Sequence, residues 1–433
     1  MRLTSVFLLG CLVGACVDPA ADPGEAPQPP GKADSPGYSV AGGRAWYLVG
    51  NELTAGDDEL RLEIAAPSTV SSVRLYLDGR FVRRVQRSAG TFTFVEDIAA
   101  LPPGAHRVLL AADQATTAFS ALDFTRSHPL YVAVSNDWDD PDHPDDKLRR
   151  QERLHERHPD LVITHFVGPY TFTEDVTPAR RKVLVDWVNQ LAATEGDEIG
   201  LHVHPWCTFV RASGVTCRTS PSFAYATGDT TGYTVRLDSY TQPELEKMFA
   251  KASELFVANG LPRPTSFRAG GWTAEVHVLA ALATAGHVAD SSGCNWSRLE
   301  EWKNHAGASL YAWNQEHWAP IDETSQPYYP STTDMLADAA PHLPILEVPD
   351  NGLLVDYVTG AEMIDMFRAN WNGGALAEPT SYSIGYHPVS FSEPFFSRLD
   401  EALTEIDRHL ASSGAGPVIY VRVSDLPRAF PRP

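Results

Sequence analysis

Two histidines lie one residue apart at the end of an apolar segment, in the sequence EIGLHVHPW at residues 198–206. Successive side chains of a β-strand point to opposite faces, so we expect His202 and His204 to lie on the same face of a strand. Two neutral imidazoles and one carboxylate are a common ligand set for a catalytic zinc ion, which keeps one position open for water. The pattern therefore indicates a metal site, although such a pair alone is more often two ordinary surface or core histidines.

A carboxylate for such a site follows an earlier strand-like segment, YVAVS at residues 131–135. The next residues read NDWDD, so Asp137 and Asp139 share a face and Asp140 is adjacent. We assign Asp137 as the general base that takes a proton from water. Asp139 is the preferred metal ligand and Asp140 is its rival, although an Asp-rich turn is more often a solvated loop or a calcium-like site.

Three later strand-like segments are also followed by polar residues: SF by Arg268, HVA by Asp290 and YSIGY by His387. A metal ion makes a bound water hydroxide-like near neutral pH, and a separate histidine can protonate a leaving amine. We expect His387 to be this acid, with Asp290 holding its imidazolium. Arg268 is expected to keep the Asp137 carboxylate charged. Chance seldom places such groups at five strand ends, so together they indicate a hydrolytic metal site.

In this order the segments resemble the five motifs of the polysaccharide deacetylase family, carbohydrate esterase family four. SNDWDD resembles the motif with the Asp base and Asp ligand, and EIGLHVHPW resembles the paired-His motif. SFRAGGW, ADSSGCNW and GYHP resemble the Arg, Asp and late His motifs. The resemblance covers roughly residues 128–425. It implies a distorted (β/α) barrel that carries a metal ligand and removes acetyl groups from N- or O-acetylated sugars. The Asp and His ligand types favour one divalent ion, with zinc preferred.

The motifs also depart from the family pattern. The adjacent Asp pair of the family is spread over residues 137–140. The family's paired histidines are three or four residues apart on a turn, whereas here they are one residue apart on a strand, which makes His202 a firmer ligand than His204. Gly270 stands where the family commonly has proline.

The elements that must position these residues alternate between strand and helix in the C-terminal part of the chain. Thr177-Pro178 is typical of a helix start and Gly196 of its end, and TQPE at residues 241–244 is a capping box for the next helix. Repeated β-α units predict a parallel sheet with its chemistry at the carboxyl ends of the strands. We assign residues 128–433 to an α/β fold, a distorted (β/α) barrel of the polysaccharide deacetylase type.

Residues 38–127 show a different pattern, which predicts β-strands and no helices. Two alternating runs flank Asp78-Gly79, which predicts a hairpin, and further strand-like runs follow at close spacing. This pattern resembles bacterial immunoglobulin-like modules and predicts a small all-β sandwich. It carries no cluster of His, Cys or carboxylates, so we expect a spacer or docking unit.

The first residues are typical of an export signal. Arg2 supplies a positive charge, and SVFLLGCLVGA is an apolar stretch too short to span a bilayer as a mature helix. VGAC resembles a lipobox, which implies that residues 1–16 are a lipoprotein signal peptide with Cys16 lipidated; Cys11 is a poorer candidate, and a plain secretion signal is the alternative. Residues 17–37 are rich in Pro, Ala, Gly and Asp and predict a disordered tether. We expect an exported protein, held at the cell envelope facing the periplasm or the surface, or secreted.

Three cysteines lie beyond the signal region. In an oxidising compartment Cys207 and Cys217 are close enough in sequence to form a disulfide, which leaves Cys294 as a buried thiol. The net charge of −21 argues against a nucleic-acid or anionic-membrane partner, because such proteins carry basic patches. Membrane contact is therefore expected only through the lipid anchor.

A long irregular segment at residues 291–343 is rich in aromatic residues. Aromatic rings over a barrel mouth can stack on sugar rings, and equally they can form a lid that only packs on the barrel. We assign Trp296, Tyr328 and Tyr329 of this segment, with Trp272 of the AGGW turn, as candidate substrate-binding residues.

These observations favour an exported metal-dependent hydrolase that deacetylates an acetylated glycan or peptidoglycan. A metal-dependent amidohydrolase is the closest enzymatic rival, but there the two histidines open the barrel, whereas here the carboxylates come first. The other alternative is a non-catalytic cell-surface protein that binds carbohydrate or docks on a deacetylase-like barrel. The joint presence of Asp137, Arg268, Asp290 and His387 favours an enzyme, because a binding protein needs none of them.

Overall fold

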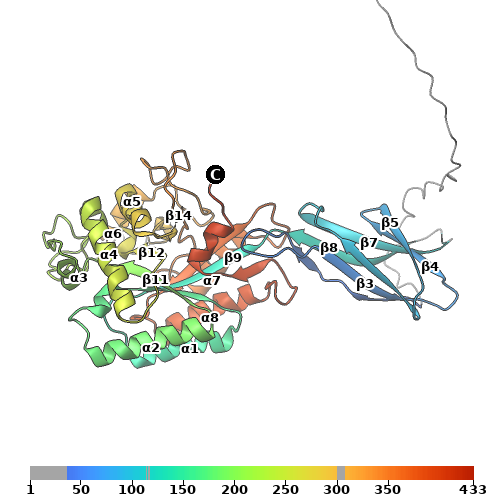
Figure 1. The fold of residues 1–433 in the computed structure, drawn as a ribbon, viewed down its shortest axis with the longest axis horizontal. Helices are drawn as coiled ribbons and strands as arrows, with labels where there is room; N and C mark the ends of the chain where they lie inside the picture. The colour runs from blue at the N-terminus through green and yellow to red at the C-terminus, as the bar shows by residue number, and fades with distance from the viewer. Residues whose placement is uncertain (1–36, 114, 116–117, 300–307) are drawn as a thin grey trace, which may run out of the picture. The chain divides into compact units, whose positions relative to one another are not determined.

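The computed structural model describes residues 37–113, 115, 118–299 and 308–433. These residues form two compact units (Figure 1). The smaller unit contains the described residues up to Gly43 together with Arg61–Val95 and His106–Asp123. The larger unit contains Arg44–Leu60, Glu96–Ala105 and Phe124–Pro433, and it holds all of the candidate site residues that the structure describes.

The larger unit is built on an eight-stranded sheet in which every neighbouring pair of strands is parallel. The strand order is β14-β13-β12-β11-β10-β9-β15, and β16 also pairs with β9. The strands are β9 (Leu130–Asp137), β10 (Ile163–Val167), β11 (Glu198–Val203), β12 (Ser266–Ala269), β13 (Ala289–Asp290), β14 (Leu346–Glu347), β15 (Thr380–Tyr386) and β16 (Val418–Tyr420). All residues of β9 to β12 are buried, as expected for parallel strands covered on both faces.

An irregular segment links the two ends of this strand order. Asp350 donates its N–H to the carbonyl of Gly293, 2.7 Å away, just after β13. Gly352 and Val355 donate to the carbonyls of Ser383 and Gly385 on β15, at 2.8 and 2.9 Å. Residues 350–355 therefore stand between the β13–β14 edge and β15 without forming a regular strand, and the whole arrangement fits the expected distorted (β/α) barrel.

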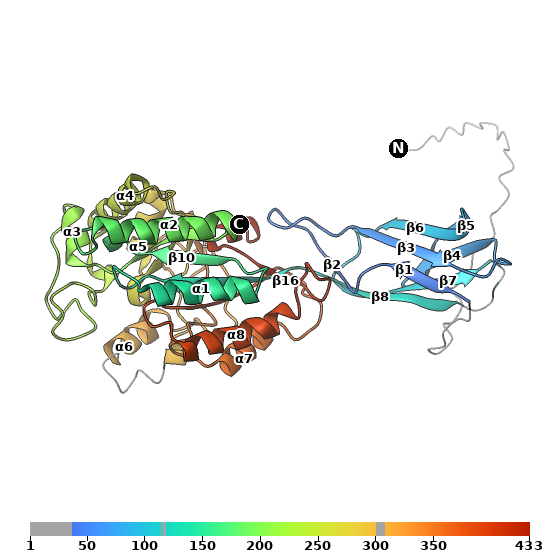
Figure 2. The same cartoon turned by 90° about the horizontal axis from the view of Figure 1, so that it is seen from below.

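Helices follow the strands, as the sequence predicts. They are α1 (Asp145–Arg157), α2 (Pro178–Thr194), α3 (Cys207–Ala212), α4 (Gln242–Ala258), α5 (Val276–Ala285), α6 (Ala308–His317), α7 (Gly360–Asn370) and α8 (Glu393–Asp407). Helix α2 begins after Thr177, whose side chain accepts a hydrogen bond from the N–H of Arg180, and α5 ends at Gly286 in the left-handed conformation. Helices α4 and α5 pack together, as do α7 and α8 (Figure 2). None of the described helices combines the length and apolar character needed to cross a bilayer.

The N-terminal strands form two further sheets, β1-β3-β6 and β2-β8-β7-β4-β5. Their bounds are β1 (Ser39–Gly42), β2 (Trp46–Leu48), β3 (Glu59–Ala65), β4 (Ser72–Leu77), β5 (Arg80–Gln86), β6 (Thr91–Asp97), β7 (Gly104–Ala112) and β8 (Phe119–Ser127). Asp78 and Gly79 join β4 to β5 with positive φ angles of 49° and 79°, as the predicted hairpin requires. An immunoglobulin-like topology remains a prediction. The signal segment with Cys16 and residues 17–36 of the tether lie outside the described residues.

Candidate metal centre and active site

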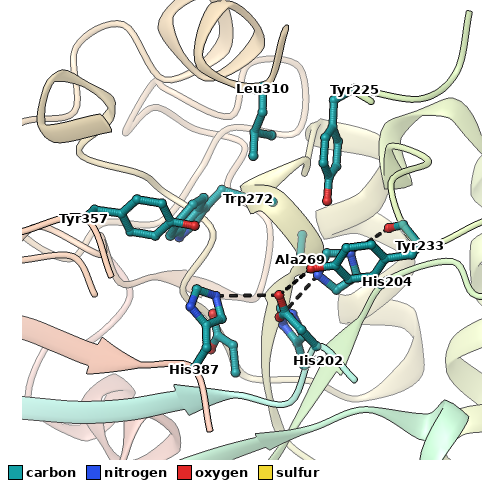
Figure 3. Close-up of a pocket in the computed structure, with 12 residues that line it drawn as sticks. His202, His204, Tyr225, Tyr233, Ala269, Trp272, Leu310, Tyr357 and His387 are labelled. Carbon is teal, nitrogen blue, oxygen red and sulfur yellow. Dashed lines mark hydrogen bonds and ion pairs between the residues drawn. The ribbon is translucent and has the colours of Figure 1, made fainter. Parts of the chain in front are cut away.

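Asp139, His202 and His204 converge at the carboxyl ends of β9 and β11, which lie on either side of β10 in the sheet. Figure 3 shows the His202 and His204 side chains at this end of the sheet. Asp139 follows β9, His202 lies on β11, and His204 follows β11 directly. One carboxylate oxygen, Oδ1 of Asp139, lies 3.1 Å from Nε2 of His202 and 3.3 Å from Nε2 of His204. Within the described ranges, these are the three residues whose possible ligand atoms lie within 4.8 Å of one another.

Hydrogen bonds to backbone carbonyls fix both imidazole rings. Nδ1 of His202 lies 2.9 Å from the carbonyl oxygen of Arg268, and Nδ1 of His204 lies 2.8 Å from that of Tyr233. A carbonyl only accepts, so each Nδ1 carries a hydrogen, and Nε2 is the ring atom of each histidine that is available to a metal ion. Both Nε2 atoms and the Asp139 oxygen face one another closely enough to bind one cation together. A carboxylate oxygen and two imidazole nitrogens are a donor set that suits zinc.

The other carboxylate oxygen of Asp139 is also held. The hydroxyl of Tyr233 donates to Oδ2 at 2.7 Å, and Nε2 of His387 lies 3.7 Å from the same atom. Burial alone would raise the pKa of Asp139, but His387 and the other two histidines lower it well below its usual range. The rival ligand Asp140 is half-buried and outside the cluster, and burial together with the charge of Asp139 raises its pKa.

Arg268 contacts Asp137, as the sequence predicts. Its side chain is fully buried on β12, and Nη1 donates to Oδ1 of Asp137 at 3.2 Å and to the hydroxyl of Ser135 at 2.8 Å. Nε donates to the carbonyl of Ser291 at 2.9 Å, and Nη2 lies 3.6 Å from a carboxylate oxygen of Asp350. Burial lowers the pKa of Arg268, but Asp137 and Asp350 more than offset this effect. The guanidinium therefore fixes the position of the Asp137 carboxylate.

His387 follows β15 and lies beside Asp139 because β15 pairs directly with β9. Its Nδ1 is 3.0 Å from Oδ2 of Asp356, which also accepts a hydrogen bond from the N–H of His387 at 3.3 Å. Burial opposes the charged imidazolium, but Asp139 and Asp356 raise the pKa of His387 to about 10. A divalent cation bound to Asp139 would offset part of that increase.

The expectation that Asp290 holds His387 is wrong. Asp290 lies on β13, on the far side of β12 from the metal ligands, and its carboxylate accepts from the N–H and hydroxyl of Ser292. It forms a buried carboxyl pair with Glu347, in which burial raises both pKa values and Asp290 raises that of Glu347 further. Asp356 was missed because it follows the irregular segment rather than a strand. Its sequence context, NGLLVDY, nevertheless has the same form as the other sites, an apolar run that ends in an acid.

The cluster lies in a cavity of about 190 Å³. Its floor is formed by the polar residues just described, and its walls come from inserted loops and turns and from helix α6. The wall side chains are Tyr225, Tyr233, Trp272, Leu310 and Tyr357. Figure 3 shows Tyr225, Trp272 and Tyr357 around the space above His387 and His202. The three tyrosines were not predicted, because their segments have no strand or helix periodicity.

Of the predicted substrate-binding aromatics, only Trp272 lines this cavity. Trp296 donates its indole N–H to the carbonyl of Ala319, and the hydroxyl of Tyr328 donates to the carbonyl of Met335. Tyr329 is buried in a hydrophobic cluster. None of these three lines the cavity: Trp296 and Tyr328 bond within the long loop, and Tyr329 packs against residues of the sheet.

Gly270 leaves the space that His204 occupies. A Cβ atom at residue 270 would lie 2.6 Å from Cγ and Nδ1 of the His204 ring. The two departures from the family pattern thus belong together, because the close histidine spacing requires a residue without a side chain at 270. Nearby, Cys207 and Cys217 form a disulfide with their Cα atoms 5.2 Å apart, and Cys294 is a buried free thiol.

No protein-family model matches the chain, and no curated protein is significantly similar to it. Solved structures with a similar arrangement include a protein from Mycobacterium smegmatis assigned as a polysaccharide deacetylase (16% identity, 69% of this chain and 88% of that one, TM-score 0.40). They also include a family 4 carbohydrate esterase from Streptomyces lividans (10% identity, 70% and 96%, TM-score 0.35). A 4-alpha-glucanotransferase from Thermococcus litoralis is similar over 69% of this chain and 40% of its own (9% identity, TM-score 0.39). Likeness of this size does not establish an activity.

Proposed function

We propose that the chain is a metal-dependent hydrolase that removes acetyl groups from an N- or O-acetylated carbohydrate, such as an acetylated glycan or peptidoglycan. The strongest support is the content of one cavity: a three-ligand cluster, a carboxylate held by an arginine, and a histidine held by a carboxylate. Hydrolysis of an amide or ester by metal-activated water needs these three parts, a cation site, a base and an acid.

Asp139, His202 and His204 would hold the cation, with zinc favoured by the nitrogen-rich ligand set. A bound cation supplies Lewis acidity to a water molecule and to the carbonyl oxygen of the substrate. The chain contributes rings whose tautomers are already fixed and a cavity on the open side of the cluster. Purified protein should carry about one divalent ion per chain, and His202→Ala should lose it.

Asp137 is the proposed base. It lines the cavity at the same strand end as Asp139, and the buried guanidinium of Arg268 holds its carboxylate. A carboxylate held in this way accepts a proton from water while its orientation stays fixed.

His387 is the proposed acid. The hydrogen on Nδ1 is directed to Asp356, so Nε2 is the atom that faces the cavity and passes a proton to the leaving nitrogen or oxygen. A protein that only binds carbohydrate needs neither proton-transfer pair, so the pairs Asp137–Arg268 and Asp356–His387 favour turnover over binding alone.

The cavity walls fit a small acetylated sugar unit. Aromatic faces pack well against the apolar faces of sugar rings. The volume of about 190 Å³ is below the roughly 300–1,000 Å³ of sites for drug-sized ligands. It therefore suits an acetyl group with the sugar that carries it, while the rest of a polymer stays outside.

The test is acetate release from N-acetylated oligosaccharides, O-acetylated xylan and peptidoglycan, with and without a chelator. We expect release that the chelator abolishes and added zinc restores. Asp137→Asn and His387→Ala should each lose about a hundredfold to ten-thousandfold in rate while keeping their metal. His317→Ala is the matched control, because His317 pairs with Glu275 outside the cavity lining. Glycan binding without release from any substrate would instead support the non-catalytic alternative.

We also propose export and lipidation at Cys16, which the lipobox-like sequence supports. Mass analysis of the mature N-terminus in the native host tests this. A free N-terminus at another position would indicate a plain secretion signal.

A further inference from the structure

Tyr233 contacts two of the three candidate metal ligands through three different groups. Its hydroxyl donates to Oδ2 of Asp139 at 2.7 Å. Its carbonyl oxygen accepts from Nδ1 of His204 at 2.8 Å. Its ring stacks on the His204 imidazole, with centroids 4.3 Å apart and planes inclined by 29° (Figure 3).

Each contact restrains a degree of freedom that matters for a ligand. A carboxylate can rotate, but the tyrosine hydroxyl holds Oδ2 and leaves Oδ1 facing Nε2 of both histidines. The carbonyl fixes the His204 tautomer, and the stacked ring limits its tilt. Groups that orient ligands in this way typically change metal affinity by about 10–100-fold when they are removed.

The backbone of Tyr233 is itself held close to the end of β11. The N–H of Cys207 donates to the carbonyl of Thr231 at 2.7 Å. Gly232 has a φ of +89°, and a Cβ there would lie 2.3 Å from the carbonyl oxygen of Pro205. Asp229 accepts hydrogen bonds from both the N–H and the hydroxyl of Thr234. The Tyr233 carbonyl is therefore positioned by the loop, independently of the tyrosine hydroxyl.

We propose that Tyr233 is a positioning residue that sets metal affinity by holding Asp139 with its hydroxyl. The inference rests on the proposed metal site, and it concerns a single oxygen atom of a side chain that no sequence motif includes. The hydroxyl acts on the carboxylate alone, because the ring and carbonyl hold His204 without it. Removal of the hydroxyl should therefore loosen Asp139 and leave His204 in place.

The experiment compares Tyr233→Phe with Tyr225→Phe in the full chain. Tyr225 is the matched control, a second tyrosine of the same cavity that is not hydrogen-bonded to a ligand within the described residues. Zinc affinity is measured by competition with a chromogenic chelator, and circular dichroism of the metal-free proteins checks folding. We expect Tyr233→Phe to bind zinc about 10–100-fold more weakly and Tyr225→Phe to stay within about twofold of the wild type.

Cobalt substitution gives a second reading that does not depend on activity. The visible absorption of bound cobalt reports its ligand geometry, so Tyr233→Phe should change the spectrum and Tyr225→Phe should not. Wild-type affinity and spectrum in Tyr233→Phe would overturn the inference while leaving the metal site intact. If the wild type itself binds neither zinc nor cobalt, the proposed function fails, and the two failures are thus distinguishable.

Discussion

The contact between Gly270 and His204 permits a substitution whose effect can be worked out from the structure. The φ angle of Gly270 lies outside the left-handed region, so alanine is acceptable to the backbone and Gly270→Ala adds only a methyl group. That methyl would lie 2.6 Å from Cγ and Nδ1 of His204 and 2.7 Å from Cε1. The imidazole must retreat by about 0.8 Å to restore an ordinary 3.4 Å contact.

This retreat is large for a metal ligand. Ligand distances in metal sites hold to within about 0.2 Å, so a displacement of this size removes His204 from the cluster. It also acts against the hydrogen bond to the Tyr233 carbonyl and the stacked tyrosine ring, which both hold the imidazole where it is. We therefore expect zinc affinity to fall by at least about 10–100-fold.

The assay is zinc titration against a competing chelator for Gly270→Ala, His204→Ala and the double variant. Because both changes remove the same ligand, the double variant should bind no more weakly than His204→Ala alone. Gly374→Ala is the control, since its Cβ would meet only the side-chain oxygen of Asn372 at 3.2 Å. An affinity for Gly270→Ala within about twofold of the wild type would refute the steric argument. A double variant whose loss of zinc affinity equals the sum of the two single losses in free energy would also refute it.

Three other variants probe the site and its surroundings. Arg268→Ala leaves two buried carboxylates without their partner and should lower the free energy of unfolding by about 3–5 kcal/mol, measured by chemical denaturation. Asp356→Asn removes a charge that raises the pKa of His387, so the acid should lose its proton at lower pH and the alkaline limb of the pH–rate profile should shift to lower pH. An alkaline limb at the wild-type pH would exclude His387 as the acid. Replacing Cys207 and Cys217 by serine should cost about 2–3 kcal/mol of stability, and peptide mapping that finds both native thiols free would contradict the disulfide.

The strand-borne part of the site was predictable because strand geometry is regular. Buried parallel strands alternate their side chains and end at one edge of the sheet, so polar residues at the ends of apolar runs must gather there. Asp139, His202, His204 and Arg268 are brought together in this way. The helices were predictable from their caps, as at Thr177.

The remaining parts of the site come from segments without periodicity. Asp356 follows an irregular stretch that runs beside β15, and Tyr233 lies in a loop whose course depends on contacts with residues 205–207. Trp296 and Tyr328, in contrast, were assigned to the site from the sequence but do not line the cavity. Their composition suggested a sugar-stacking surface, but burial of apolar rings is the commoner use of aromatic residues, and the long loop needs them for its own packing.

The irregular segment that links the ends of the strand order also supplies a carboxylate to the support of each proton-transfer group. At its start, Asp350 lies 3.6 Å from Arg268 and accepts the indole N–H of Trp272 at 3.0 Å. Just beyond its end, Asp356 holds His387. The same stretch of backbone therefore carries the carboxylate that contacts both Arg268 and Trp272 and leads directly to the carboxylate that holds His387. Base and acid therefore depend for their position on one buried, hydrogen-bonded piece of chain and not on two independent loops.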